Sequence, residues 1–128
     1  LNILSKGNNY GWPEITYGKN YTGTKITNYT HKDGMEQPVI HWTPSIAVCG
    51  MDFYDGKIFN NWKNNLLVTS LKFENLYRLE IRNEKVIEQE LILSAGSRVR
   101  DVETGPDGFI YLAIEDPGRI IRLKPHKK

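Results

Sequence analysis

The sequence predicts an all-β fold of short antiparallel strands, and three observations support this. Apolar residues occur in short runs or alternate with polar residues at a period of two, which is typical of strands. Gly, Pro, Asn or Asp bounds each run, as turn chemistry requires. The same order of strands and turn residues occurs twice along the chain. No segment has the apolar period of a convincing helix.

Eight strands are expected. The segment 75–82 is the clearest, because its apolar and polar residues alternate as in a half-buried antiparallel strand. The other predicted strands are similarly short and are also bounded by Gly, Pro, Asn or Asp. The predicted strands are 39–43, 47–54, 65–71, 76–82, 86–94, 99–104, 109–114 and 119–123.

The repeat unit predicts propeller blades. One Asp is followed by an Asp-Gly turn, then an apolar strand, then a second strand that carries an Arg. Two such units are offset by about 44 to 49 residues, the usual size of a blade of three or four antiparallel strands. A meander or a sandwich also gives evenly spaced short strands and remains the alternative. The markers are Asp52, Asp55-Gly56, Leu66-Leu67-Val68 and Leu76 to Leu79, then Asp101, Asp107-Gly108, Ile110-Tyr111-Leu112 and Ile120 to Leu123.

A chain of 128 residues is too short to close a ring of such blades, because even four blades need about 160 residues. We therefore expect the C-terminal part of a longer protein, with about two blades of an incomplete ring. The open edges of these blades are expected to pair with another chain. The expected divisions are the tail of a preceding blade and a long loop (1–38), a complete blade (39–94), a final three-stranded blade (95–124) and a basic tail (125–128).

Composition indicates an ordinary globular domain: 39% of the residues are hydrophobic and 25% are charged. The net charge of +2 and the scattered basic residues argue against nucleic-acid binding. No apolar span is long enough for a transmembrane helix. The single cysteine, Cys49, lies in an apolar run and is expected to be a buried thiol.

Three cations mark a candidate binding site. Arg98 and Arg100 stand two residues apart at the start of a predicted strand, so their side chains should share one face. Lys72 directly follows another predicted strand. In a propeller the innermost strand of a blade starts, and the second strand ends, on the same face of the ring. The three groups are thus expected to form a site for a compact anion rich in carboxylates or phosphates. Taken one by one, each is more commonly a solvated surface cation, and the prediction of a site rests on the three together.

Four motifs in the same order closely resemble the C-terminal third of the glucose/sorbosone dehydrogenase family, over residues of about 1 to 124. They are Asn9-Tyr10-Gly11-Trp12-Pro13, Trp42-Thr43-Pro44-Ser45-Ile46-Ala47, Asn65 to Lys72, and Arg98-Val99-Arg100-Asp101-Val102 with Gly105-Pro106-Asp107-Gly108. The family comprises soluble aldose dehydrogenases that use pyrroloquinoline quinone (PQQ) on a six-bladed β-propeller. The resemblance thus implies that fold, a periplasmic or secreted location, and an aldose and an electron acceptor as partners.

The resemblance also implies site residues. Lys72, Arg98 and Arg100 would hold the quinone, and Trp42 would line the cofactor and sugar cleft. Tyr10 resembles a position whose backbone carbonyl binds Ca²⁺, a hard cation that oxygen ligands suit. For both aromatic residues a structural role remains the alternative.

No catalytic base is assigned. In the family a histidine of an earlier blade takes the proton of the sugar hydroxyl, and the histidines here, His31, His41 and His126, stand in no segment that resembles its motif. We therefore expect this chain alone to be inactive. Two other functions stay open for the parent protein: a non-enzymatic propeller module for protein or ligand recognition, and a Ca²⁺-dependent lactone or ester hydrolase.

Overall fold

The structure is a computed structural model that describes residues 1–126. It has two compact units, Leu1–Ser45 and a second one that starts at Ile46. The first unit is irregular, and an isolated bridge between Lys19 and Lys25 is its single element of sheet pairing among the described residues. Inside it, Gly11 has a φ of +87°, and a Cβ at this position would lie 2.1 Å from Cγ1 of the buried Ile15. Glycine is therefore required there by both conformation and space.

The strand expected over 39–43 does not form, so this prediction is wrong. The backbone N–H of Val39 donates to the carbonyl of Leu1 (2.8 Å), and the N-terminal ammonium donates to the carbonyl of Ile40 (2.9 Å). Pro38 and Pro44 bound the segment and offer no N–H group of their own. Val39 and Ile40 thus form hydrogen bonds with the N-terminal residue Leu1 instead of joining a β-sheet.

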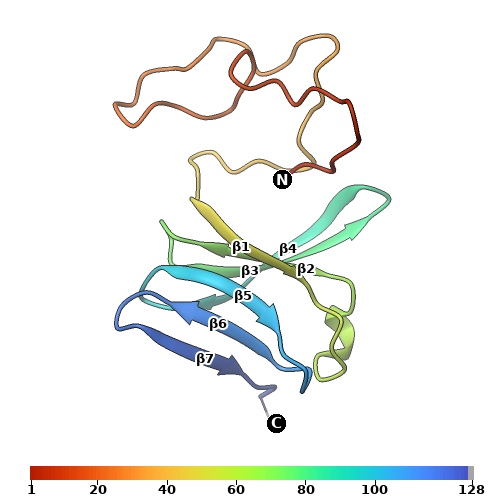
Figure 1. Cartoon of the computed structure of the whole chain (residues 1–128), viewed down its shortest axis with the longest axis vertical. Helices are drawn as coiled ribbons and strands as arrows, with labels where there is room; N and C mark the ends of the chain where they lie inside the picture. The colour runs from red at the N-terminus through yellow and green to blue at the C-terminus, as the bar shows by residue number, and fades with distance from the viewer. Residues whose placement is uncertain (127–128) are drawn as a thin grey trace. The chain divides into compact units, whose positions relative to one another are not determined.

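The second unit contains the blades (Figure 1). The first sheet has four antiparallel strands in the order β1 (Val48–Phe53), β2 (Leu66–Ser70), β3 (Asn75–Arg82) and β4 (Lys85–Ser94). A 3-10 helix, η1 (Asn60–Trp62), lies in the β1–β2 connection. The second sheet has three antiparallel strands, β5 (Val99–Thr104), β6 (Ile110–Ile114) and β7 (Arg119–Leu123). The all-β, antiparallel blade architecture is confirmed, and the seven strands lie within one or two residues of their predicted ranges.

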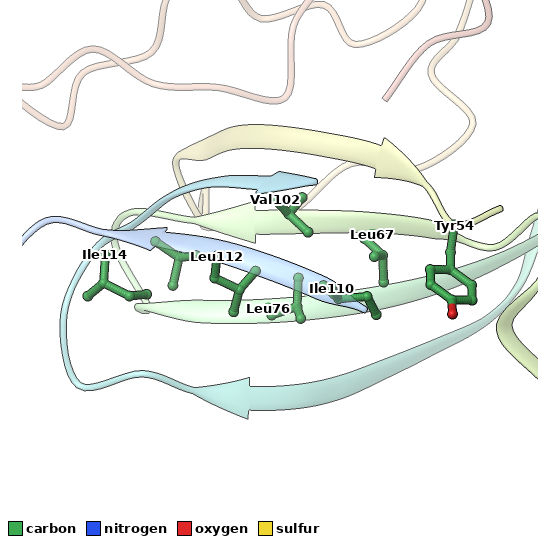
Figure 2. Packing of buried hydrophobic residues seen from close by; sticks show 8 residues of the cluster. Tyr54, Leu67, Leu76, Val102, Ile110, Leu112 and Ile114 are labelled. Atoms are coloured by element: carbon green, nitrogen blue, oxygen red, sulfur yellow. The ribbon is translucent and has the colours of Figure 1, made fainter. Parts of the chain in front are cut away.

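The core of this unit lies between the two sheets. Leu67 of β2 and Leu76 of β3 pack with residues of β5 and β6, and all of them are almost completely buried (Figure 2). Every residue of β2 is buried, as expected for a strand inside a sheet. The cluster consists of Tyr54, Leu67, Leu76, Val99, Val102, Ile110, Leu112 and Ile114.

Strands β1 and β5 approach each other closely at one residue of each. A Cβ on Gly50 would lie 2.7 Å from the Cα of Asp101, so only glycine fits at this point of β1. Two residues further along β1, Oδ2 of Asp52 accepts hydrogen bonds from the backbone N–H (2.8 Å) and the hydroxyl (2.6 Å) of Thr104. The order of these contacts shows that β1 and β5 run in the same direction and start at the same end of their sheets.

A buried arginine ties the outer strand to its sheet. Arg78 of β3 is 7% exposed; its Nε donates to Glu90 (2.9 Å) and its Nη2 to Glu88 (2.8 Å), both on β4. Its Nη1 donates to the side-chain carbonyl of Asn65, next to β2. A buried guanidinium needs such partners, because an unpaired one would carry a large desolvation cost.

We predict that Tyr54→Phe lowers the free energy of unfolding by about 2–3 kcal/mol. The hydroxyl of Tyr54 donates to the carbonyl of Gly108 (2.7 Å) and accepts from the backbone N–H groups of Ile58 and Phe59 (both 3.0 Å). The side chain is fully buried, so its loss leaves three backbone groups without this partner. Urea denaturation of the protein measures the effect. Tyr111→Phe is the matched control, since that hydroxyl donates to the exposed carboxylate of Asp107 (2.7 Å). Equal losses in both variants would contradict the prediction.

Candidate functional site

The two arginines of the predicted site lie at the start of β5. Arg98 precedes the strand, and Arg100 is its second residue. The register with β6 pairs Val99 with Ile114 and Asp101 with Ala113, so Arg100 is the extra residue of a β-bulge. Bulges redirect a side chain relative to the regular alternation of a strand.

Both guanidinium groups converge on one carboxylate oxygen. Oε2 of Glu115 lies 2.9 Å from Nη2 of Arg100 and 3.7 Å from Nη1 of Arg98. The side chains of the two arginines are 57% and 45% exposed, so solvent reaches both of them. The two arginines thus lie together at the surface, beside an acidic residue that was not among the expected site residues.

The backbone holds Glu115 beside the arginines. Its N–H donates to the carbonyl of Arg98 (3.0 Å). The next N–H, of Asp116, donates to the hydroxyl of Ser97 (3.1 Å), which is buried. The end of β6 is therefore tied to the residues that lead into β5.

The electrostatic surroundings keep Arg100 charged. The hydrogen bond from Arg100 to Glu115, and then the charge of Glu115, raise the pKa of Arg100 above its ordinary value, although the guanidinium is exposed. Cys49 of β1 contributes to the raised pKa of Arg100 to a smaller extent.

Cys49 is exposed, so the expectation of a buried thiol is wrong. β1 is an edge strand of its sheet, which leaves one side of the strand uncovered.

Glu115 and Cys49 are the site neighbours that sequence reasoning missed. A signal for Glu115 was present: in an antiparallel hairpin the end of the second strand lies beside the start of the first. Applied to the predicted strands 99–104 and 109–114, this rule pairs Glu115 with Arg98. No comparable signal existed for Cys49, because its contact with Arg100 joins two different sheets.

Lys72 lies at the same end of the two sheets as the arginine pair. Its backbone N–H donates to the carbonyl of Ile46 (3.1 Å), just before β1 starts, and β1 and β5 start at the same end. Its ammonium lies 5.6 Å from the ring centroid of Phe73. Among the described residues, Lys72 has no ion pair with Glu115, the carboxylate on which the two arginines converge, so the lysine lies at that end without joining their cluster.

The two aromatic residues of the predicted site belong to the first unit. Trp42 is half-buried there, and its role in lining a cleft stays a prediction. The hydroxyl of Tyr10 donates to the carbonyl of Ile3 (2.9 Å) and accepts from the N–H of Ser5 (2.6 Å). The predicted Ca²⁺ ligand is its backbone carbonyl, so this assignment also stays a prediction. In the same unit, His41 stacks on Tyr17 with ring centroids 3.7 Å apart.

Over residues 1–126, no three His, Cys, Asp or Glu side chains are grouped so that they could hold a metal ion. Within the part of the chain that the structure describes, no helix has the length and the apolar character needed to cross a membrane.

Comparison with known proteins identifies the relatives of this chain. The family model described as glucose/sorbosone dehydrogenase matches residues 1–122. The aldose sugar dehydrogenase YliI of Escherichia coli (strain K12) is 42% identical over 129 residues, which cover 98% of this chain and 35% of that protein. The crystal structure of the soluble aldose sugar dehydrogenase from Escherichia coli in the apo-form has a TM-score of 0.89 at 40% identity, over 98% of this chain and 37% of that one.

A further solved structure, the PQQ-bound form of aldose sugar dehydrogenase from Streptomyces coelicolor, shares the fold with a TM-score of 0.67 at 22% identity. This similarity covers 96% of the present chain and 35% of that structure. The present chain thus spans about a third of the length of the relatives it matches. Since the family model covers nearly all of the chain and the relatives share its blades, the chain belongs to the glucose/sorbosone dehydrogenase family.

Proposed function

We propose that this chain is the part of a PQQ-dependent aldose dehydrogenase that holds the quinone, through Lys72, Arg98 and Arg100. The convergence of the two guanidinium groups on a single point carries this proposal. The relatives that are named aldose sugar dehydrogenases, and the one solved with PQQ bound, support it.

The residues at this point fit the cofactor. PQQ bears three carboxylates and an ortho-quinone, and a guanidinium fork is the best protein partner for a carboxylate. Each guanidinium has five N–H donors. Glu115 contacts one nitrogen of each through one shared oxygen, so further donors of both arginines remain for a ligand.

When bound, PQQ would supply the oxidant for the two-electron oxidation of an aldose to its lactone, in which the hydride of the anomeric carbon passes to the quinone and the proton of the anomeric hydroxyl to a base of the longer protein. The residues of this chain would bind and orient it. The arginines anchor its carboxylates, and a cation near the quinone oxygens stabilises the negative charge of the reduced form. Lys72, at the same end of the sheets, is the candidate for this second role.

The remaining parts of the reaction belong to the longer protein. We propose no base among the histidines of this chain. Four further proposals rest on the family resemblance alone. The backbone carbonyl of Tyr10 binds Ca²⁺, and Trp42 contacts the sugar. The protein passes its electrons to an external acceptor, and it is periplasmic or secreted. The free edges of the two sheets are proposed to pair with other strands.

We predict that the parent protein reduces a dye in an aldose-dependent manner once PQQ and Ca²⁺ are added, whereas the present chain alone shows no turnover. The reason is that the chain supplies cations for the cofactor and no assigned base. Dye reduction with several aldoses measures it. No activity of the parent with any of them would contradict the enzyme assignment and favour a recognition module.

We also predict that Lys72→Ala and the double change Arg98→Ala/Arg100→Ala weaken PQQ binding, by about 1.5–3 kcal/mol for each charged hydrogen bond lost. Quinone titration of the parent protein, followed by absorbance, measures the affinity. Arg82→Ala is the matched control: it also removes an exposed arginine that has one acidic partner, Glu80, at the far end of β3. If the control and the site variants all bind PQQ as tightly as the wild type, the assignment of the quinone site to Lys72, Arg98 and Arg100 is wrong.

A further inference from the structure

Glu115 stands between the two arginines of the proposed site. Its Oε2 is within 2.9 Å of Arg100 and 3.7 Å of Arg98. Two guanidinium groups that approach the same point repel each other, and a carboxylate between them offsets this repulsion. In the observed geometry the negative charge of Glu115 thus lies where it lowers the repulsion between the two arginines.

We infer that Glu115 is a positioning residue of the quinone site, whose carboxylate holds Arg98 and Arg100 together so that they meet the cofactor as a pair. This inference rests on the proposed function. It concerns ligand binding through the arginines; Glu115 itself need not touch the quinone.

The backbone geometry suits this role. The N–H of Glu115 is bonded to the carbonyl of Arg98, so the carboxylate is carried by the same hairpin as the arginines. The flanking bond from Asp116 to the buried Ser97 fixes the turn that follows β6. The backbone of Glu115 is thus held by contacts within the hairpin itself. Since pre-organised groups lose less conformational freedom on binding, the arginine pair gains affinity from being held.

The donor count explains why Glu115 does not block the site. One carboxylate oxygen contacts one nitrogen of each arginine, and each guanidinium keeps further N–H donors. The cluster of the three residues also keeps a net positive charge. A polycarboxylate can therefore bind without displacing Glu115.

The test compares Glu115→Gln with the wild-type parent protein in a PQQ titration. The change removes the charge and keeps the size of the side chain. Because exposed ion pairs are worth about 0.2–1 kcal/mol, we expect the dissociation constant to rise up to about fivefold. Glu103→Gln, an equal charge change at an exposed position of β5, should leave the affinity unaltered.

A second comparison shows whether Glu115 acts through the arginines. In an Arg100→Ala background, the effect of Glu115→Gln on PQQ affinity should shrink toward zero, because its main partner is absent. An equal loss in both backgrounds would mean a general structural role and would overturn the inference. Circular dichroism and the urea midpoint of each variant report whether the fold is retained.

The other outcomes separate this inference from the function on which it rests. If the wild-type parent binds no PQQ, the proposed function fails and the inference fails with it. If the wild type binds PQQ and loses it in Arg98→Ala/Arg100→Ala, but Glu115→Gln binds as tightly as the wild type or more tightly, only the inference is overturned. Tighter binding would identify Glu115 as a competitor of the ligand.

Discussion

The register of the β5–β6 hairpin is the constraint on which the candidate site depends. Val99 and Val102 of β5 and Ile110, Leu112 and Ile114 of β6 are buried against the other sheet. A slip of one residue would turn each of these side chains to the opposite face, at a cost of about 1.5–3 kcal/mol for every large apolar side chain exposed. The hydrophobic core therefore fixes which residues lie side by side at the end of the hairpin, and the contacts of Arg98 and Arg100 with Glu115 follow from it.

The second constraint is the close approach of the first strands of the two blades. Gly50 lets the backbone of β1 reach that of β5, and the hydrogen bonds from Thr104 to Asp52 hold the two strands in one relative position. As a result the starts of both strands, and the loop that carries Lys72, lie at the same end. Cations from two blades thus lie at one end of the sheets, although Lys72 and Arg98 are 26 positions apart in the sequence. The packing of the two sheets therefore also determines where these cations lie.

Much of this architecture could be predicted from sequence, and the exceptions have physical reasons. Strands such as β3 and β5 were predictable because their alternation and turn residues are local signals. The segment 39–43 shows the same alternation but lies between two prolines and bonds to Leu1, a partner that no local pattern reveals. The arginine pair was predictable from its spacing. The ion pairs with Glu115 follow from the register of the predicted hairpin, which already places Glu115 beside Arg98. The contact of Arg100 with Cys49 depends on the packing of one sheet against the other, which no local pattern shows.

A structure of the parent protein with PQQ bound would test the central claim most directly. The account predicts that carboxylate oxygens of the quinone lie within hydrogen-bond distance of the guanidinium groups of Arg98 and Arg100, with Glu115 still in contact with Arg100. It also predicts that the ammonium of Lys72 faces the same ligand. A quinone bound elsewhere, with the arginine pair free in solvent, would contradict the account.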